Sequence, residues 1–132
     1  MIAHLATAAL LVTAALACAA DDLLAAPPEI PADAVDFTGQ SDVVVRVTDN
    51  RFTDRIIVVS AGTQVTWINE GRDSHNVRPA DEGAFASIST ESLDDGGAGS
   101  VLFRAVGDFP YFCSIHGAPG RGQTGQVLVI GA

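Results

Sequence analysis

The chain reads YFCSIHGAPGRGQ from residue 111 to residue 123. This stretch places a thiol, an imidazole and an amide oxygen within one short loop, on Cys113, His116 and Gln123. An apolar run opens the loop and a second apolar run, residues 127–130, closes it. A soft sulfur, a borderline nitrogen and a weaker oxygen donor on one turn form the donor set that a copper ion needs when it cycles between two oxidation states.

A second imidazole is available upstream. His75 lies in the run Ser74-His75-Asn76-Val77 and can complete a set of two histidines and one thiolate. The only other cysteine, Cys18, follows an apolar N-terminal segment that predicts export, and we expect it to be lipidated, removed or part of a membrane anchor, so Cys113 has no disulfide partner in the exported domain. Metal ligation is the commonest task of an unpaired thiol outside the cytosol, and we therefore expect Cys113 to be a ligand rather than a small buried hydrophobe.

At these residues the chain resembles the cupredoxins, the small blue-copper electron carriers that include plastocyanin, amicyanin and the phytocyanins. The resemblance covers roughly residues 43 to 131 and includes the run AGTQVTWIN at 61–69, a frame that this family commonly shows before its first histidine ligand. It implies one type 1 copper ion in the plane of His75, Cys113 and His116. Most of the family has an axial methionine after the loop histidine, whereas this chain has Gln123 and its only methionine is Met1.

Gln123 is the candidate for the axial position. The spacing Cys-x2-His-x6-Gln returns the chain to the metal just before the last strand. An amide oxygen is a harder donor than a thioether and should lower the reduction potential. The alternative leaves Gln123 as a solvated loop residue and lets the carbonyl of Asp73 approach the metal.

The resemblance also implies roles for the neighbours of the ligands. The loop histidine of the family exposes a ring edge among small apolar residues, here Gly117, Ala118 and Pro119. Around His116, this patch would be the electron port and the docking face for a redox protein donor and acceptor. Asn76 matches a position that often ties the two ligand loops together, although it could equally be a turn-forming residue.

Six aromatic residues are expected in the core. They are Phe52, Trp67, Phe85, Phe103, Phe109 and Phe112. Tyr111 lies close to the ligands in the sequence and is a candidate for a second electron path.

Length and charge limit the classes of function. The 132 residues allow one domain with one modest core, which excludes the multidomain copper oxidases. Sixteen acidic residues against seven basic ones, all arginine, produce a net charge of −9. Binding to nucleic acid, or to an anionic membrane by charge alone, is therefore not expected.

The N-terminal residues predict export. Residues 2–20 are almost wholly apolar, which is typical of a secretory signal, and Cys18 follows a sequence that looks like a bacterial lipobox. We expect a lipid on Cys18 that anchors the protein to the outer face of the cell membrane. The alternatives are ordinary cleavage nearby, which would leave a periplasmic protein, and an uncleaved membrane anchor.

Proline, alanine and acidic residues follow this segment. They predict an extended, solvated linker over residues 19–42. The expected organisation is a leader at 1–18, this linker, and a copper-binding domain at 43–132.

Short β-rich runs separated by Gly, Asn and Asp occupy the domain. They predict an all-β fold, an antiparallel β-sandwich of Greek-key type. The runs are Val43–Val47, Ile56–Val59, Gln64–Ile68, Ser100–Arg104, Phe109–Cys113 and Gln126–Ile130.

The function expected from these features is one-electron transfer by a monomeric carrier that is not an enzyme. The alternative is a protein that binds or delivers copper without electron transfer, but the Met- or His-rich tracts that would support it are missing from the sequence. No third member of a Cys–His triad stands in a recognisable motif. A closed zinc site usually needs four nitrogen or sulfur ligands, and only His75, Cys113 and His116 are left once the leader with His4 is removed.

Overall fold

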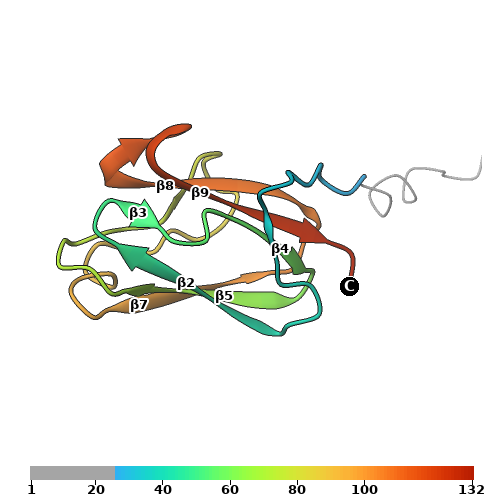
Figure 1. The fold of residues 1–132 in the computed structure, drawn as a ribbon, viewed down its shortest axis with the longest axis horizontal. Coiled ribbons are helices and arrows are strands. Elements are labelled where there is room, and N and C mark those ends of the chain that lie inside the picture. Colours follow the sequence, from blue (N-terminus) through green and yellow to red (C-terminus); the bar gives the residue numbers. More distant parts are fainter. Residues whose placement is uncertain (1–25) are drawn as a thin grey trace, which may run out of the picture.

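The computed structural model describes residues 26–132, and the strands found there build an all-β sandwich (Figure 1). The six predicted strands are present, and three short strands accompany them. In chain order the strands are β1 (Val35–Asp36), β2 (Asp42–Thr48), β3 (Arg51–Phe52), β4 (Ile56–Ser60), β5 (Thr63–Asn69), β6 (Arg78–Pro79), β7 (Ala98–Phe103), β8 (Gly107–Ala118) and β9 (Arg121–Ile130).

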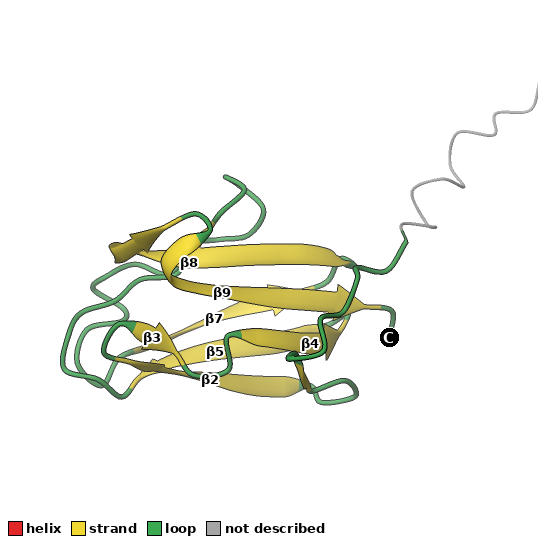
Figure 2. Ribbon diagram, turned by 45° about the horizontal axis from the view of Figure 1, so that its top comes forward, coloured by secondary structure: helices red, strands yellow, loops and turns green. Residues whose placement is uncertain are grey.

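The strands form two sheets that lie face to face (Figure 2). One sheet has the order β1-β4-β9-β8-β6 and the other has the order β3-β2-β5-β7. The predicted sandwich is therefore confirmed, but the sheets are mixed where the sequence predicted antiparallel pairing. The pairs β1–β4, β2–β5 and β4–β9 are parallel. Parallel partners need a crossover connection. Between β2 and β5 the chain crosses to the other sheet, forms β4 there, and then returns.

Alternation of side chains explains the core. Val43, Val45 and Val47 of β2 are buried, whereas the intervening Val44 is exposed. Successive residues of a strand point to opposite faces, so one face of β2 packs against the other sheet. Trp67 of β5 is fully buried in the same cluster.

Most of the predicted core aromatic residues lie in this cluster. Phe52, Trp67 and Phe103 are buried, and Phe85 and Phe109 are partly buried against them. The prediction for Phe112 is wrong. Phe112 is only half-buried because its neighbours Tyr111 and Cys113 both point into the core, which turns Phe112 to the opposite face of β8.

The N-terminal part of the sandwich starts before residue 43. Val35 and Asp36 pair with Ile57 and Val58 of β4, within the segment expected to be a solvated linker. Beside them, Ala34 packs on an apolar patch of Ile56, Val58 and Leu128 on the outer face of the sheet. This patch explains the early start, because ordering a few residues there removes apolar surface from water.

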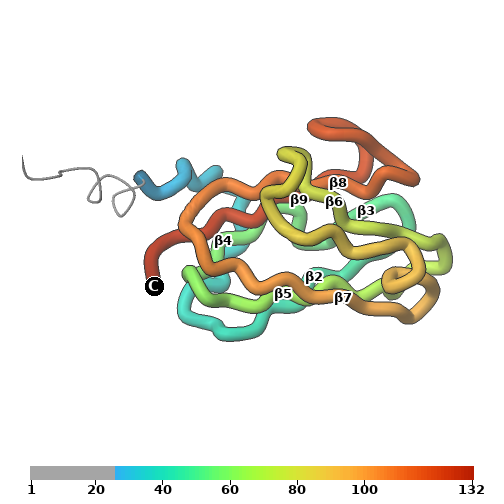
Figure 3. Tube along the Cα trace, turned by 180° about the vertical axis from the view of Figure 1, so that it is seen from behind, coloured from blue at the N-terminus to red at the C-terminus, as the bar shows by residue number. Residues whose placement is uncertain are grey.

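The hairpin that carries the quoted stretch lies at one end of the sandwich. The tip between β8 and β9 is far from the C-terminus in two opposite views (Figures 1 and 3). The described part of the chain contains no helix that is long and apolar enough to cross a membrane. The predicted leader and Cys18 lie outside the described residues.

Candidate metal centre

The ligand candidates from the quoted stretch lie where β8 leaves its ladder with β9. The register shifts between Phe112 and Gly117, so Cys113 and His116 fall inside the irregular segment. Bulges of this kind re-aim side chains next to functional sites. Gln123 lies in β9, just after the turn of the hairpin.

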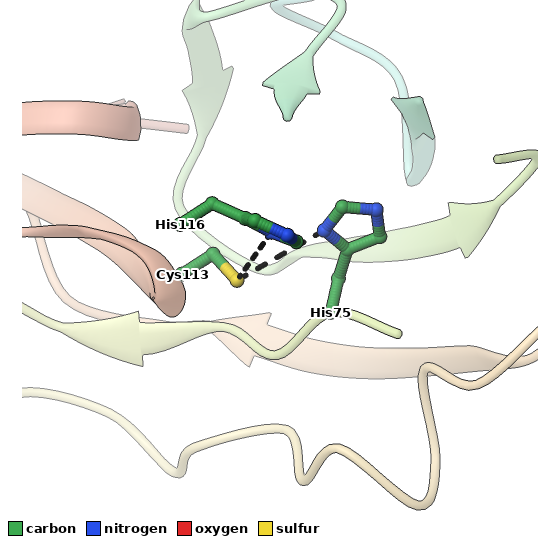
Figure 4. A group of neighbouring side chains, drawn as sticks. All are labelled: His75, Cys113 and His116. Carbon is green, nitrogen blue, oxygen red and sulfur yellow. Dashed lines mark hydrogen bonds between the residues drawn. The ribbon is translucent and has the colours of Figure 1, made fainter. Parts of the chain in front are cut away.

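His75 comes from a different part of the sandwich. It lies in the connection between β5 and β6, and its backbone N–H donates to the carbonyl of Leu93 at 3.1 Å. Figure 4 shows the ring of His75 facing Cys113 and His116. One donor atom from each of the three residues lies within 4.8 Å of the other two. The fold thus brings together residues that are 38 positions apart in the sequence.

The two hydrogen-bond distances around the sulfur are long and also match the spacing between ligands of one metal ion. Sγ of Cys113 lies 3.9 Å from Nδ1 of His75 and 3.9 Å from Nδ1 of His116. With metal–sulfur and metal–nitrogen bonds of about 2.3 and 2.05 Å, two ligands at 120° are about 3.8 Å apart. Both sulfur–nitrogen separations therefore match those expected for ligands of one ion.

Gln123 completes this group. Its Oε1 lies 3.0 Å from Nδ1 of His75 and 3.2 Å from Nδ1 of His116. Nitrogen and oxygen ligands each about 2.1 Å from a metal and at a right angle to one another are about 3.0 Å apart. The side chain is buried, with 2% exposed, and its Nε2 has no hydrogen-bond partner. Gln123 is thus not a solvated loop residue, and its oxygen points to the place where the other donors meet.

The carbonyl oxygen of Asp73, the other candidate for the axial position, already accepts a hydrogen bond. The carbonyl of Asp73 accepts a hydrogen bond of 2.8 Å from Nδ2 of Asn69. The same Asn69 side chain donates to the carbonyl of Leu93 at 3.0 Å and accepts from the N–H of Gly71 at 2.9 Å. The side chain of Asn69 therefore fixes the loop before His75, and the carbonyl of Asp73 points toward this side chain.

Burial sets the charge state of the first histidine. The side chain of His75 is fully buried, and this burial lowers its pKa although the hydrogen bond to Gln123 acts in the opposite direction. A neutral imidazole keeps a lone pair on one ring nitrogen, which is the form that binds a metal. Cys113 is also fully buried, so two of the donors are shielded from water.

Asn76 links the two ligand loops as expected. Its Oδ1 accepts from the N–H of Ser114 at 2.8 Å, and its Nδ2 donates to Oγ of Ser114 at 2.8 Å. A weaker bond of 3.3 Å reaches Oγ1 of Thr90. Asn76 is therefore a link between loops and not only a turn residue.

His116 is the donor that reaches the surface. Its side chain is 22% exposed, and Ile115 beside it is 49% exposed. Ala118 is half-buried and Pro119 is exposed. A carboxylate oxygen of Asp73 lies 3.9 Å from Nε2 of His116, so the exposed edge has an acidic neighbour that the sequence did not predict.

Tyr111 belongs to the core. It is 1% exposed and packs edge-on against Phe52 and Trp67, with ring centroids 4.8 and 5.2 Å away. Burial raises the pKa of its phenol far above the ordinary value.

Two residues near the site were missed by reasoning from the sequence. Asn69 appeared only as the last residue of the run at 61–69, and no role was predicted for Asp49. Oδ1 of Asp49 accepts hydrogen bonds from the N–H groups of Arg72 and Asp73 at 2.8 and 3.1 Å. Local patterns do not report such contacts, because the partners are 23 and 24 positions apart.

A known protein family matches most of the described sequence. Residues 40–129 match the family described as copper binding proteins, plastocyanin/azurin family. No curated protein sequence matches the chain.

Solved structures with the same fold include amicyanins and a larger enzyme. Amicyanin from Paracoccus versutus (Thiobacillus versutus) is 27% identical, over 77% of this chain and 86% of that chain, with a TM-score of 0.55. A Cu(I) form of an amicyanin mutant with glutamine in place of a methionine is 26% identical, over 68% and 83%, with a TM-score of 0.56. A copper-containing nitrite reductase from Thermus scotoductus is 23% identical over 68% of this chain but only 22% of that chain, with a TM-score of 0.55, and shows the fold alone.

Proposed function

The chain belongs to the plastocyanin/azurin family of copper-binding proteins, and from this we propose that it is a one-electron carrier with a single type 1 copper ion. We assign the ligands as His75, Cys113, His116 and Gln123. The observation that carries this proposal is the convergence of their four donor atoms on one buried point. Similarity to amicyanin, one form of which was solved with Cu(I), supports the redox role.

Copper would supply the chemistry by alternating between its cupric and cuprous states. The protein's part is to hold the donors still. Asn76 joins the loop of His75 to that of Cys113, and Asn69 clamps the residues before His75. Donors that cannot relax need little rearrangement when the charge of the site changes, and this favours rapid transfer.

Burial does not favour the alternative of copper delivery. A delivery protein needs a site that exchanges its metal readily, whereas His75 and Cys113 are both 0% exposed. The only feature that favours an enzyme is the similarity in fold to the copper-containing nitrite reductase. Among residues 26–132, one group of His, Cys and acidic side chains converges as a metal site, and we assign no reaction to it.

The exposed edge of His116 is the proposed port for electrons. Redox proteins are the class of partner that fits an amicyanin-like fold. We place their docking face around His116, Ala118 and Pro119, and we expect the carrier to act as a monomer. Two copies of the protein exchange an electron when their docking faces meet. A charge introduced at the centre of this face should therefore slow the exchange.

Electron self-exchange, measured by NMR line broadening in mixtures of the two redox states, tests the docking face. Ala118→Glu should slow the exchange by at least about tenfold, since two like charges would meet at contact. Leu102→Glu is the matched control, because Leu102 is 44% exposed on β7. Equal rates for the two variants would place the port elsewhere.

Cupredoxins typically act outside the cytoplasm, and we propose the same for this chain. Attachment through a lipid on Cys18 stays a prediction, because that residue lies outside the described part of the chain. Mass spectrometry of the protein from native membranes should find a diacylglyceryl group on Cys18. A soluble native form that begins downstream of Cys18 would contradict it.

Visible and EPR spectra of the copper-loaded protein test the function itself. A short, covalent bond between Cys113 and cupric ion should produce an intense charge-transfer band in the visible range. Cys113→Ala should abolish this band, and zinc-loaded wild type should be colourless. If wild type binds cupric ion and remains colourless, the proposal of a blue-copper carrier is wrong.

A further inference from the structure

One ring nitrogen of the first histidine is left without a partner. Nε2 of His75 is buried and makes no hydrogen bond, while Nδ1 of the same ring faces the sulfur and Gln123. The carboxylate of Asp49 lies beside the free nitrogen, with Oδ1 at 3.9 Å. That separation is too long for a hydrogen bond but short enough for a charge–dipole attraction, which water screens in part because the Asp49 side chain is 46% exposed.

The fold holds Asp49 in this place. It lies in the two-residue turn between β2 and β3, where Asn50 has a positive φ of 64°. Oδ1 of Asp49 also accepts from the N–H groups of Arg72 and Asp73. Glycine is required at position 71, because a Cβ there would fall on this same oxygen. A carboxylate anchored by two backbone donors cannot easily swing away into solvent.

We propose that Asp49 is a positioning residue that selects the metal-binding tautomer of His75, an inference that rests on the proposed copper site. A neutral imidazole carries one ring proton. The negative oxygen of Asp49 favours that proton on Nε2, which leaves the lone pair of Nδ1 free for the metal. The amide oxygen of Gln123, 3.0 Å from Nδ1, favours the proton on Nδ1 instead. The charge of Asp49 biases this competition toward the ligating form.

Asp49→Asn tests this idea with little change of shape. The amide oxygen still accepts from Arg72 and Asp73, but the charge is lost. Asp94→Asn is the matched control: Asp94 also binds the loop of His75, through Oγ of Ser74 at 2.8 Å, and no contact joins it to the His75 ring. Loss of a group that orients a metal-binding histidine typically weakens metal affinity by about 10- to 100-fold. We expect such a loss of cupric affinity for Asp49→Asn and a change below about threefold for Asp94→Asn.

Nitrogen-15 NMR of the copper-free protein provides a readout that a merely structural role would not change. Wild type and Asp94→Asn should carry the proton of His75 mainly on Nε2, and Asp49→Asn should shift it toward Nδ1. Unchanged backbone amide shifts outside residues 47–52 and 69–76 will show that the variant is folded.

The outcomes separate this inference from the copper proposal. If Asp49→Asn keeps the wild-type tautomer, or loses no more affinity than Asp94→Asn, Asp49 has no positioning role even in a blue protein. A colourless wild type overturns the function proposed above, while the tautomer measurement, which needs no copper, still decides the role of Asp49.

Discussion

Asn76 and Ser114 are joined by two hydrogen bonds of 2.8 Å each. The first residue directly follows His75 and the second directly follows Cys113. Each bond therefore ties the loop of one proposed ligand, His75, to the loop of another, Cys113. The arrangement of the donors depends on this link and not only on the strands beneath them.

Replacing Asn76 by Ala should loosen the site. Both bonds to Ser114 are lost, and a hydrogen bond contributes about 0.5–1.5 kcal/mol net, so the free energy of unfolding of the copper-free protein should fall by about 1–3 kcal/mol. Ser114→Ala removes only the bond to Oγ and should cost about half as much. Chemical denaturation measures both, and equal losses would show that the bond to the Ser114 N–H contributes nothing.

Gln123→Met should raise the reduction potential. The soft thioether stabilises the cupric state less than the amide oxygen does, so the cuprous state gains in relative terms. For one electron, about 59 mV corresponds to a tenfold change in relative affinity, and we expect a rise of about 60 to 200 mV with the blue band retained.

The matched control for this change is Gln126→Met in the same strand, where the glutamine binds the surface residue Asp108. Protein-film voltammetry and EPR compare the three proteins. A Gln123→Met variant with the potential and EPR parameters of wild type would show that Gln123 is not a ligand.

Gly125→Ala should destabilise the fold. A Cβ at this position would overlap the ring and hydroxyl of Tyr111, which is packed against Phe52 and Trp67 and cannot move aside. Overpacking of this kind costs about 1–3 kcal/mol. Gly131→Ala, which meets open space, should change the stability by less than about 0.5 kcal/mol. Thermal unfolding of both variants checks the difference.

Tyr111 should resist ionisation in the folded protein. Burial raises its pKa well above the ordinary value of 10.0. The stability linked to the neutral phenol is therefore fully present below pH 10.0 and is lost as the pH rises from there toward the folded pKa, by up to about 1.4 kcal/mol per pH unit.

The sequence contains one tyrosine, so tyrosinate absorbance reports Tyr111 alone. At about pH 11 the folded protein should show almost no tyrosinate, whereas the protein in denaturant should be about 90% ionised. A phenol that titrates near pH 10 in the folded state would mean that its ring is accessible to water.

Local patterns were sufficient for the six longer strands but not for the short strands β1, β3 and β6. Val43, Val45 and Val47 alternate with polar or exposed positions, and this period of two depends only on neighbouring residues. The same rule, applied from Cys113 backwards, would have placed Phe112 outside the core. The pairing of strands is not local. β2 pairs with β5 in parallel, and the alternating pattern of each strand would be the same in an antiparallel pair.

The donor types of the candidate site were also present in the sequence. The spacing of Cys113, His116 and Gln123 in one loop pointed to a metal, and His75 was the remaining candidate for the second imidazole. Whether an oxygen of Gln123 or of Asp73 faces the other donors was left open. The structure brings Gln123 toward both histidines and engages the Asp73 carbonyl with Asn69.

By itself, the sequence determined where the six longer strands lie and which side chains can bind copper, because both follow from residue type and short spacing. Only the tertiary structure decided the mixed pairing, the packing of Ala34 on the outer face and the approach of Asp49 to His75. These are contacts between residues more than 20 positions apart. They depend on where the backbone turns in space, and no periodicity along the chain records that.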